Sequence, residues 1–314
     1  MVSRDITRYM WKQQLDIARR DLRPSTIHME KSDAMFSDDD DNHEEPLDRR
    51  TILSPAIYNV ITALGGYEGD TYILGDECYG CLKDLKKFWR KDDTDDERTV
   101  ARIFWESRVL RNDLIPILLE TAGKGMVDNK CAIACADIIT AMTWPIDLAE
   151  ELKELDEELD RGTDYTQLLQ SHLSYKADLL RPEVINALLG ILLPCIAKDK
   201  KERKERDVQI ISVILYLFRN LAFIKDQPPN VHSSANQVEF SSLQSKLIKL
   251  YAEMHVLDLF LTVASNAKDV LFNQWNTLIL ETLYLLFRSV QPAALAVDQT
   301  KVCLFDPCLY TLNL

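Results

Sequence analysis

The chain has 314 residues, 46% of them hydrophobic, and carries 50 acidic against 37 basic residues, a formal net charge of −13. This length and apolar content support one large or two smaller folded domains. Only 9 glycines and 11 prolines occur, which excludes collagen-like and low-complexity architectures and disfavours a glycine-rich nucleotide fold. Two acidic segments, 30–50 and 147–160, account for the whole net charge, and the remainder is balanced. Overall acidity therefore does not exclude contact with nucleic acid.

The first 50 residues are expected to lie outside the folded body. The pattern of residues 1–23 predicts a short basic amphipathic helix. This helix is either a transit peptide or a solvated arm, and its three aspartates argue against the transit peptide. Residues 30–50 contain the run Asp38–Asp41 and predict a disordered acidic segment. The sequence shows no secretory signal and no uncharged apolar run of about 18 residues. Seven scattered cysteines indicate a reduced, intracellular compartment.

Helical periodicity begins after the acidic segment. Ser54 and Pro55 are expected to start the first helix, and Gly65 and Gly66 to end it with a C-cap and turn. The resemblance of these glycines, with Gly69, to a phosphate-binding loop is superficial, because they follow a helix rather than a strand.

Further helices follow in series to about residue 290. Asp76 is a candidate N-cap, and Thr94 with Glu97 is a candidate capping box. Later helices are predicted near 114–123, 127–143, 164–180, 183–197, 205–224, 239–253, 255–266 and 270–289. The acidic stretch 147–160 is expected to be a solvent-facing connector, and no segment predicts a strand. Helices of this length joined by short turns are typical of an all-α fold of the α-solenoid class.

Residue types suited to chemistry are present but scattered. Cys78 and Cys81 have the spacing of half a zinc site, yet no second pair with ligand spacing exists, and the five histidines are dispersed. Cys131 and Cys135 share an apolar helix face. These cysteines are therefore best interpreted as thiols buried in the core, and metal binding or redox chemistry is the alternative. The sequence contains no nucleotide-binding or hydrolase motif, so it predicts no enzyme and no cofactor.

Two basic clusters are candidates for contact with DNA or an acidic partner, and solvated helix ends are the alternative. The first carries +4 and comprises Lys83, Lys86, Lys87, Arg90 and Lys91. The second carries +3 and comprises Lys198, Lys200, Lys201, Arg203, Lys204 and Arg206. Arg219 and Asn220 lie inside an apolar helix, where they are expected to hydrogen-bond to a neighbouring helix end; packing between repeats is favoured over ligand contact.

Several stretches together resemble the Timeless family of replication-fork proteins. The similarity runs through Ala63–Asp70, Tyr72, Leu74–Asp76, Cys81–Phe88, Arg98, Leu110–Leu118, Thr143–Pro145, Tyr175–Lys176 and Arg219–Leu221, in the family's order. Leu110–Leu118 contains Asp-Leu-Ile-Pro-Ile-Leu, a form of the family signature, and the Trp-Pro pair resembles the fungal branch. The residues that carry this structural signature are Gly65, Gly66, Asp113, Leu114, Pro116, Trp144, Pro145, Arg219 and Asn220.

The resemblance implies an armadillo/HEAT-like α-solenoid without catalytic residues or cofactors. It also implies a nuclear scaffold of the replication fork protection complex that acts in fork stability, checkpoint signalling, DNA replication and repair. The implied partners are a small Tipin-like subunit in a heterodimer, the replicative helicase, a Claspin-like checkpoint mediator and duplex DNA, with no membrane. The alternative is a general armadillo-like adaptor that binds peptides or a small GTPase and has no role on DNA.

The resemblance covers about residues 55–300 and implies three parts. Residues 1–50 form an N-terminal arm and acidic segment, 51–299 a Timeless-like helical-repeat domain, and 300–314 an atypical tail. Family members are much longer, so the chain is expected to be a fragment, a truncated form or a gene model with a misplaced exon end.

Overall fold

The computed structural model describes residues 48–92, 95, 97–125, 128–146, 165–199, 201–227, 239–266, 270–288, 290–291 and 293. Several predictions lie outside these residues: the N-terminal arm with its acidic segment up to residue 47, Thr94, the stretch 147–160, Lys200 and the tail 300–314.

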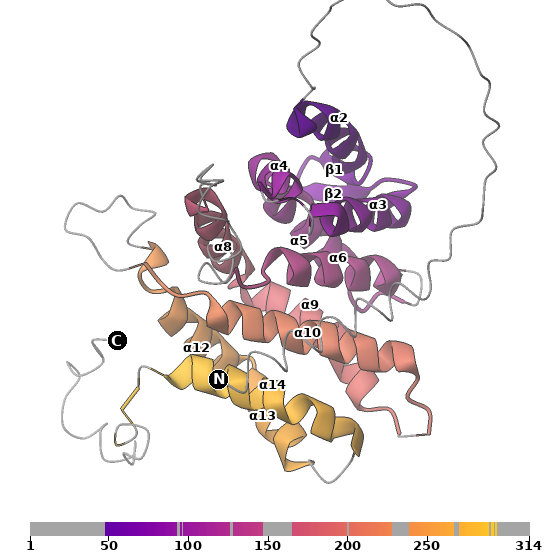
Figure 1. Cartoon of the computed structure of the whole chain (residues 1–314). Helices are drawn as coiled ribbons and strands as arrows, with labels where there is room; N and C mark the ends of the chain where they lie inside the picture. Colours follow the sequence, from indigo (N-terminus) through magenta and orange to yellow (C-terminus); the bar gives the residue numbers. More distant parts are fainter. Residues whose placement is uncertain are drawn as a thin grey trace, which may run out of the picture. The chain divides into compact units, whose positions relative to one another are not determined.

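The described part is an all-α, solenoid-like array of helices, interrupted by one hairpin (Figure 1). Its helices are α2 (Arg49–Thr62), α3 (Cys78–Lys91), α4 (Thr99–Ser107), the π-helix η2 (Leu110–Leu114), α5 (Ile115–Thr121), α6 (Asp128–Met142), α8 (Thr166–Leu179), α9 (Pro182–Ile196), α10 (Glu205–Phe223), α12 (Leu243–Glu253), α13 (Val256–Ser265) and α14 (Val270–Phe287). The predicted all-α class is confirmed, and the predicted helices from residue 127 onward agree closely with α6 to α14.

Helix α10 lies at the centre of the packing. It contacts α6, α9, α12 and α14, while α3 and α5 pack on α6 and α13 packs on α14. Its long apolar run is buried on most sides, as expected for a helix surrounded by others. The Phe218 ring meets Tyr251 at 5.4 Å and Phe260 at 6.1 Å between centroids, and Tyr251 Oη donates to the Phe218 carbonyl at 3.1 Å. One apolar core therefore runs through the successive helices.

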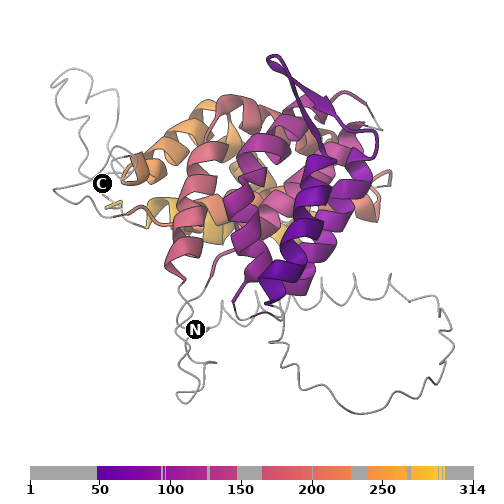
Figure 2. The same ribbon diagram turned by 90° about the horizontal axis from the view of Figure 1, so that it is seen from above.

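A β-hairpin replaces the turn that was predicted after the first helix. Strand β1 (Gly65–Glu68) pairs antiparallel with β2 (Thr71–Leu74), and Figure 2 shows the hairpin reaching beyond the helices. The prediction of a glycine C-cap is wrong, because α2 already ends at Thr62 with Ala63 as its C-cap. Gly65 has φ +151°, and a Cβ there would lie 2.2 Å from the Ile73 carbonyl oxygen. Glycine is thus required by strand pairing rather than by helix termination.

Two helix starts also differ from the prediction. Helix α2 begins at Arg49, where the Asp48 carboxylate accepts the Arg50 N–H at 3.3 Å, so Pro55 lies inside the helix instead of at its start. Helix α3 takes Glu77 rather than Asp76 as its N-cap residue, without a side-chain capping bond. The start of α2 thus follows the N-cap preference for aspartate at a residue upstream of the predicted one, whereas the start of α3 has no side-chain cap.

Helix α4 is capped by aspartates further from its start. The buried Asp92 carboxylate accepts the N–H groups of Val100 at 2.8 Å and Ala101 at 3.0 Å, and Asp95 accepts that of Thr99 at 3.0 Å. These bonds satisfy the free donors of the first turn that the predicted capping box was expected to serve.

No single helix among the described residues is long and apolar enough to span a membrane. Helices α8 and α9 reach that length and composition only as a pair bent by 83°.

Candidate functional site: a groove beside the hairpin and two basic clusters

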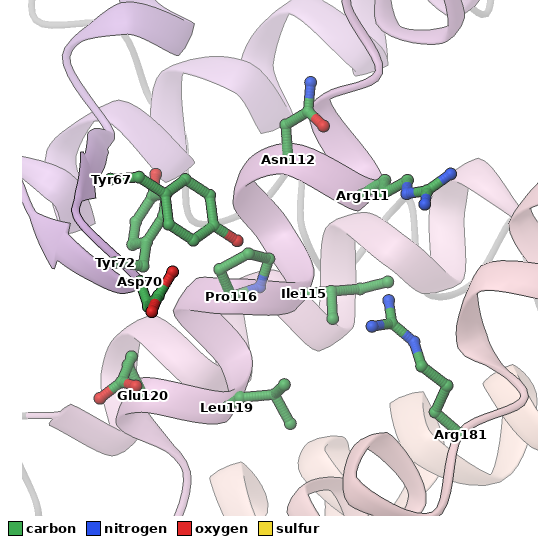
Figure 3. A pocket seen from close by; sticks show the side chains of 10 residues that line it. All are labelled: Tyr67, Asp70, Tyr72, Arg111, Asn112, Ile115, Pro116, Leu119, Glu120 and Arg181. Atoms are coloured by element: carbon green, nitrogen blue, oxygen red, sulfur yellow. The ribbon is translucent and has the colours of Figure 1, made fainter.

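A surface groove lies where the hairpin meets η2 and α5 (Figure 3). Its volume is about 320 Å³, and its lining residues are Tyr67, Asp70, Tyr72, Arg111, Asn112, Ile115, Pro116, Leu119, Glu120 and Arg181. Three apolar side chains from α5 form the middle, with the two arginines at one end and the two carboxylates at the other. Such an arrangement accommodates a ligand that has an apolar part and a charged part.

The π-helix η2 shapes one side of this groove. The Ile115 N–H donates to the Leu110 carbonyl five residues earlier, and Pro116, in the first turn of α5, has no N–H to continue the usual ladder. Leu114 is fully buried, as the signature predicts for a structural residue. Single π-turns occur frequently at functional sites. The segment that resembles the family signature therefore contains a π-helix.

Asp113 joins η2 to the hairpin. Its carboxylate accepts the hydroxyl of Tyr72 at 2.9 Å. Burial raises the pKa of Asp113, and the hydrogen bond from Tyr72 opposes that rise. Burial also raises the pKa of Tyr72, with the Asp113 charge adding to the effect. The signature aspartate thus holds the hairpin in place rather than facing the solvent.

The two arginines of the groove lie near Asp178 of α8. The Arg111 Nε lies 3.9 Å from Asp178 Oδ1, and the Arg181 Nε donates to the Asp178 carbonyl at 2.8 Å. Burial raises the pKa of Asp178, while Arg111, Arg181 and Arg108 oppose the rise and Glu239 adds to it. The spacing of residues along the chain does not reveal this site, because Arg111 and Arg181 are 70 positions apart and only the packing of η2 against α8 and of α5 against α9 brings them together.

The first predicted basic cluster lies along α3. Lys83, Lys87, Arg90 and Lys91 are exposed, and Lys83 sits 4.8 Å from the centroid of the Tyr79 ring. Lys86 differs, because it forms an ion pair with Asp137 of α6. One member of the cluster therefore joins two helices, while the others form a basic surface.

The second predicted cluster is divided by the structure in the same way. Arg203 donates hydrogen bonds to the backbone carbonyls of Cys195, Ile196 and Lys198 at 2.6–3.1 Å. These bonds satisfy free carbonyl groups at the C-terminal end of α9. Lys198 lies 2.5 Å from Asp207. The exposed members of this cluster, which a partner can reach, are Lys201, Lys204 and Arg206.

The predicted role of Arg219 and Asn220 in packing has structural support. Asn220 Nδ2 donates to the Thr140 carbonyl near the end of α6 at 3.0 Å. The Arg219 guanidinium lies 4.6 Å from the Trp144 ring centroid and 5.5 Å from that of Tyr216, and its Nε and Nη2 atoms have no hydrogen-bond partner among the described residues. Cation–π contacts therefore replace the expected hydrogen bonds for the arginine.

The cysteines of the first helices lie near one another. Burial raises the pKa of Cys78 in α3 to about 12, and the neighbouring Cys131 of α6 adds to the rise. A thiol with so high a pKa is a poor nucleophile. Within the described residues no group of three potential ligands is arranged for a metal ion. The absence of bound zinc stays a prediction, which metal analysis of the purified protein tests.

Comparison with known proteins gives one consistent result. The family model described as "Timeless protein" matches residues 71–303, which include η2, α5 and all later described helices. A "Topoisomerase 1-associated factor 1" of Cryptococcus neoformans is 41% identical over 271 residues, covering 82% of this chain and 25% of that protein. Proteins of the same name from Aspergillus clavatus and Coccidioides immitis are 32% and 33% identical, covering 78% and 74% of this chain and 21% and 20% of their own lengths. The chain thus spans a quarter or less of these relatives.

Proposed function

Because this chain belongs to the Timeless family, we propose that it is a non-enzymatic scaffold at replication forks. The observation that carries the proposal is the continuous match over residues 71–303, which spans most of the described helices. A solenoid-like array suits this role, because it offers extended surfaces to several partners at once.

The partners belong to the same proposal. They are a small Tipin-like subunit, the replicative helicase and a Claspin-like mediator, with action in the nucleus on fork stability and checkpoint signalling. The relatives are named for an association with topoisomerase 1, which adds that enzyme as a candidate. Since the chain spans only part of these relatives, the sequence outside the match can supply further contacts in the longer proteins.

Duplex DNA is proposed to meet the exposed part of the two basic clusters. The contact surface comprises Lys83, Lys87, Arg90 and Lys91 on α3 together with Lys201, Lys204 and Arg206 before and at the start of α10. Such contacts act on phosphates and carry no sequence information. Lys86, Lys198 and Arg203 are half-buried and engaged in ion pairs or helix capping, which supports leaving them out. Lys87 also pairs with Asp84, at 2.8 Å, but it stays exposed on the surface of α3.

Charge reversal tests the DNA proposal. Each exposed set is replaced by Glu in turn, and duplex DNA is titrated at two salt concentrations, for the chain alone and for the chain with a Tipin-like subunit. The matched control is Lys246→Glu with Lys249→Glu on α12, two exposed lysines outside both clusters. We expect weaker binding for the cluster variants only. If neither reversal weakens binding, alone or in the complex, the clusters are solvated surface.

A further inference from the structure

We propose that the groove beside the hairpin binds a linear peptide of a partner protein in which an acidic residue adjoins an aromatic or aliphatic one. The apolar residue would rest on α5 and against Tyr67, and the acidic residue would meet Arg111 and Arg181. This inference goes beyond the scaffold function proposed above and does not rest on DNA contact by the basic clusters.

The apolar part of the groove offers exposed apolar surface against which a peptide side chain can pack. Tyr67 is 58% exposed although it is a large aromatic residue, and its ring is held edge-on to that of Tyr72 at 5.2 Å between centroids. Ile115, Pro116 and Leu119 line the groove beside it. Aromatic residues in such positions are frequent anchors of protein interfaces, because they bury a large area at a small cost in side-chain entropy.

Charge complementarity selects the kind of peptide. The Arg111 side chain is 66% exposed, and its Nε lies 3.9 Å from Oδ1 of Asp178. The N–H donors of this guanidinium therefore remain accessible to a second carboxylate. Arg181 lines the same end of the groove. Asp70 and Glu120 line the opposite end, which favours a peptide with its acidic residue toward the arginines and a basic or neutral residue toward the acids.

The same features argue against DNA as the occupant. A phosphate backbone gains nothing from an apolar floor, and the carboxylates of Asp70 and Glu120 would repel it. The volume of about 320 Å³ lies at the low end of the range of roughly 300–1,000 Å³ for ligand pockets, which suits a few side chains of a peptide.

The walls of the groove are also pre-organised. The hairpin is fixed at its base by the Gly65–Leu74 pairing and by the hydrogen bond from Tyr72 to the half-buried Asp113. Arg108, at the junction of α4 and η2, has φ +54°, a conformation that costs energy for a residue with a side chain. A rigid groove loses little entropy when a peptide binds, which favours recognition of short segments.

A random peptide library displayed on phage, selected on the full 314-residue chain, tests the proposal. The test variants are Arg111→Glu and Tyr67→Ala, whose side chains are largely exposed, so both are expected to fold. Selected peptides should combine Asp or Glu with an adjacent aromatic or aliphatic residue. Their synthetic forms should bind each variant at least about tenfold more weakly, measured by fluorescence polarisation.

Lys246→Glu with Lys249→Glu serves as the control for charge, and thermal unfolding of every variant serves as the control for folding. Binding unchanged by the control and weakened by both groove variants supports the proposal. It is overturned if no peptide is enriched, if the enriched peptides lack acidic residues, or if folded groove variants bind them as well as the unaltered chain. It is also overturned if Arg111→Glu weakens duplex DNA binding while peptide binding is unchanged, which would make the arginines a DNA contact.

Discussion

Lys176 of α8 is fully buried, and its ammonium group is surrounded by oxygen atoms. It donates to the Ile224 carbonyl at 2.7 Å and to Gln244 Oε1 at 2.8 Å, and Asp226 Oδ1 lies 3.6 Å away. Burial lowers the pKa of Lys176 to about 8, while Asp226 opposes the decrease. The lysine thereby ties α8 to the end of α10 and the start of α12, which gives a structural reason for the Tyr175–Lys176 pair seen in the sequence.

His172 lies one turn before Lys176 on α8, and its burial leads us to expect that the free energy of unfolding falls in acid. Burial lowers its pKa to about 4 from an ordinary value of 6.5, and a hydrogen bond with the Met142 backbone opposes the decrease. As the pH falls from 6.5 towards 4, the unfolded chain binds a proton that the folded chain does not. The free energy of unfolding should therefore fall by up to about 3 kcal/mol from this residue.

Urea unfolding of the chain and of His172→Gln across that pH range measures the effect. The free energy of unfolding of the variant should depend less steeply on pH than that of the unaltered chain. An equal slope for the chain and for His172→Gln would show that the imidazole is hydrated in the folded state.

At the scale of elements, the hairpin depends on Gly65. Gly65→Ala would place a Cβ 2.2 Å from the Ile73 carbonyl oxygen at φ +151°, so it should destabilise the protein by more than about 1 kcal/mol. Gly66→Ala is the matched control, because a Cβ at that position would have nothing within 4 Å and the φ of Gly66 is not positive. Pairs in an antiparallel ladder alternate between hydrogen-bonded and non-bonded, and the Gly75 N–H donates to the Leu64 carbonyl, so the Gly66–Ile73 and Glu68–Thr71 pairs carry the ladder bonds. Hydrogen exchange at the Glu68 and Ile73 amides therefore reports the loss of pairing; equal protection in both variants would contradict the strand assignment at Gly65.

The η2–α5 segment should behave as core. Leu114 and Ile117 are both fully buried, so Leu114→Ala or Ile117→Ala should each lower the free energy of unfolding by about 2–5 kcal/mol. Chemical denaturation measures this loss, and Leu169→Ala, at a position 39% exposed, is the comparison. A loss under about 0.5 kcal/mol would mean that the signature is an interaction surface rather than a structural one.

At the scale of the whole molecule, the distribution of charge governs contact with DNA. The net charge of −13 resides in two acidic segments, and the rest of the chain is balanced. Duplex binding must then come from local basic surfaces, while repulsion by the acidic segments is limited by screening to roughly 8–10 Å at physiological salt. Partners that add contacts would raise the affinity through effective concentration.

The isolated chain is therefore expected to bind duplex DNA weakly and with strong salt dependence. Each phosphate that a basic residue neutralises should contribute about −0.9 to the slope of log K against log[salt]. Titrations at several salt concentrations give this slope directly. Tight binding that does not change with salt would contradict the electrostatic argument, whatever surface is involved.

The sequence by itself determined the helical class, the positions of most helices and the packing role of Asn220, because apolar periodicity and buried polar groups are local signals. It did not determine the hairpin, since Gly65 and Gly66 suit a helix end and a strand start equally well until Ile73 is brought opposite. Nor did it separate Lys86 and Arg203 from their exposed neighbours, because their partners lie on other helices or turns. Only the tertiary structure united Arg111 with Arg181, since a site between distant segments has no signal in the spacing of residues along the chain.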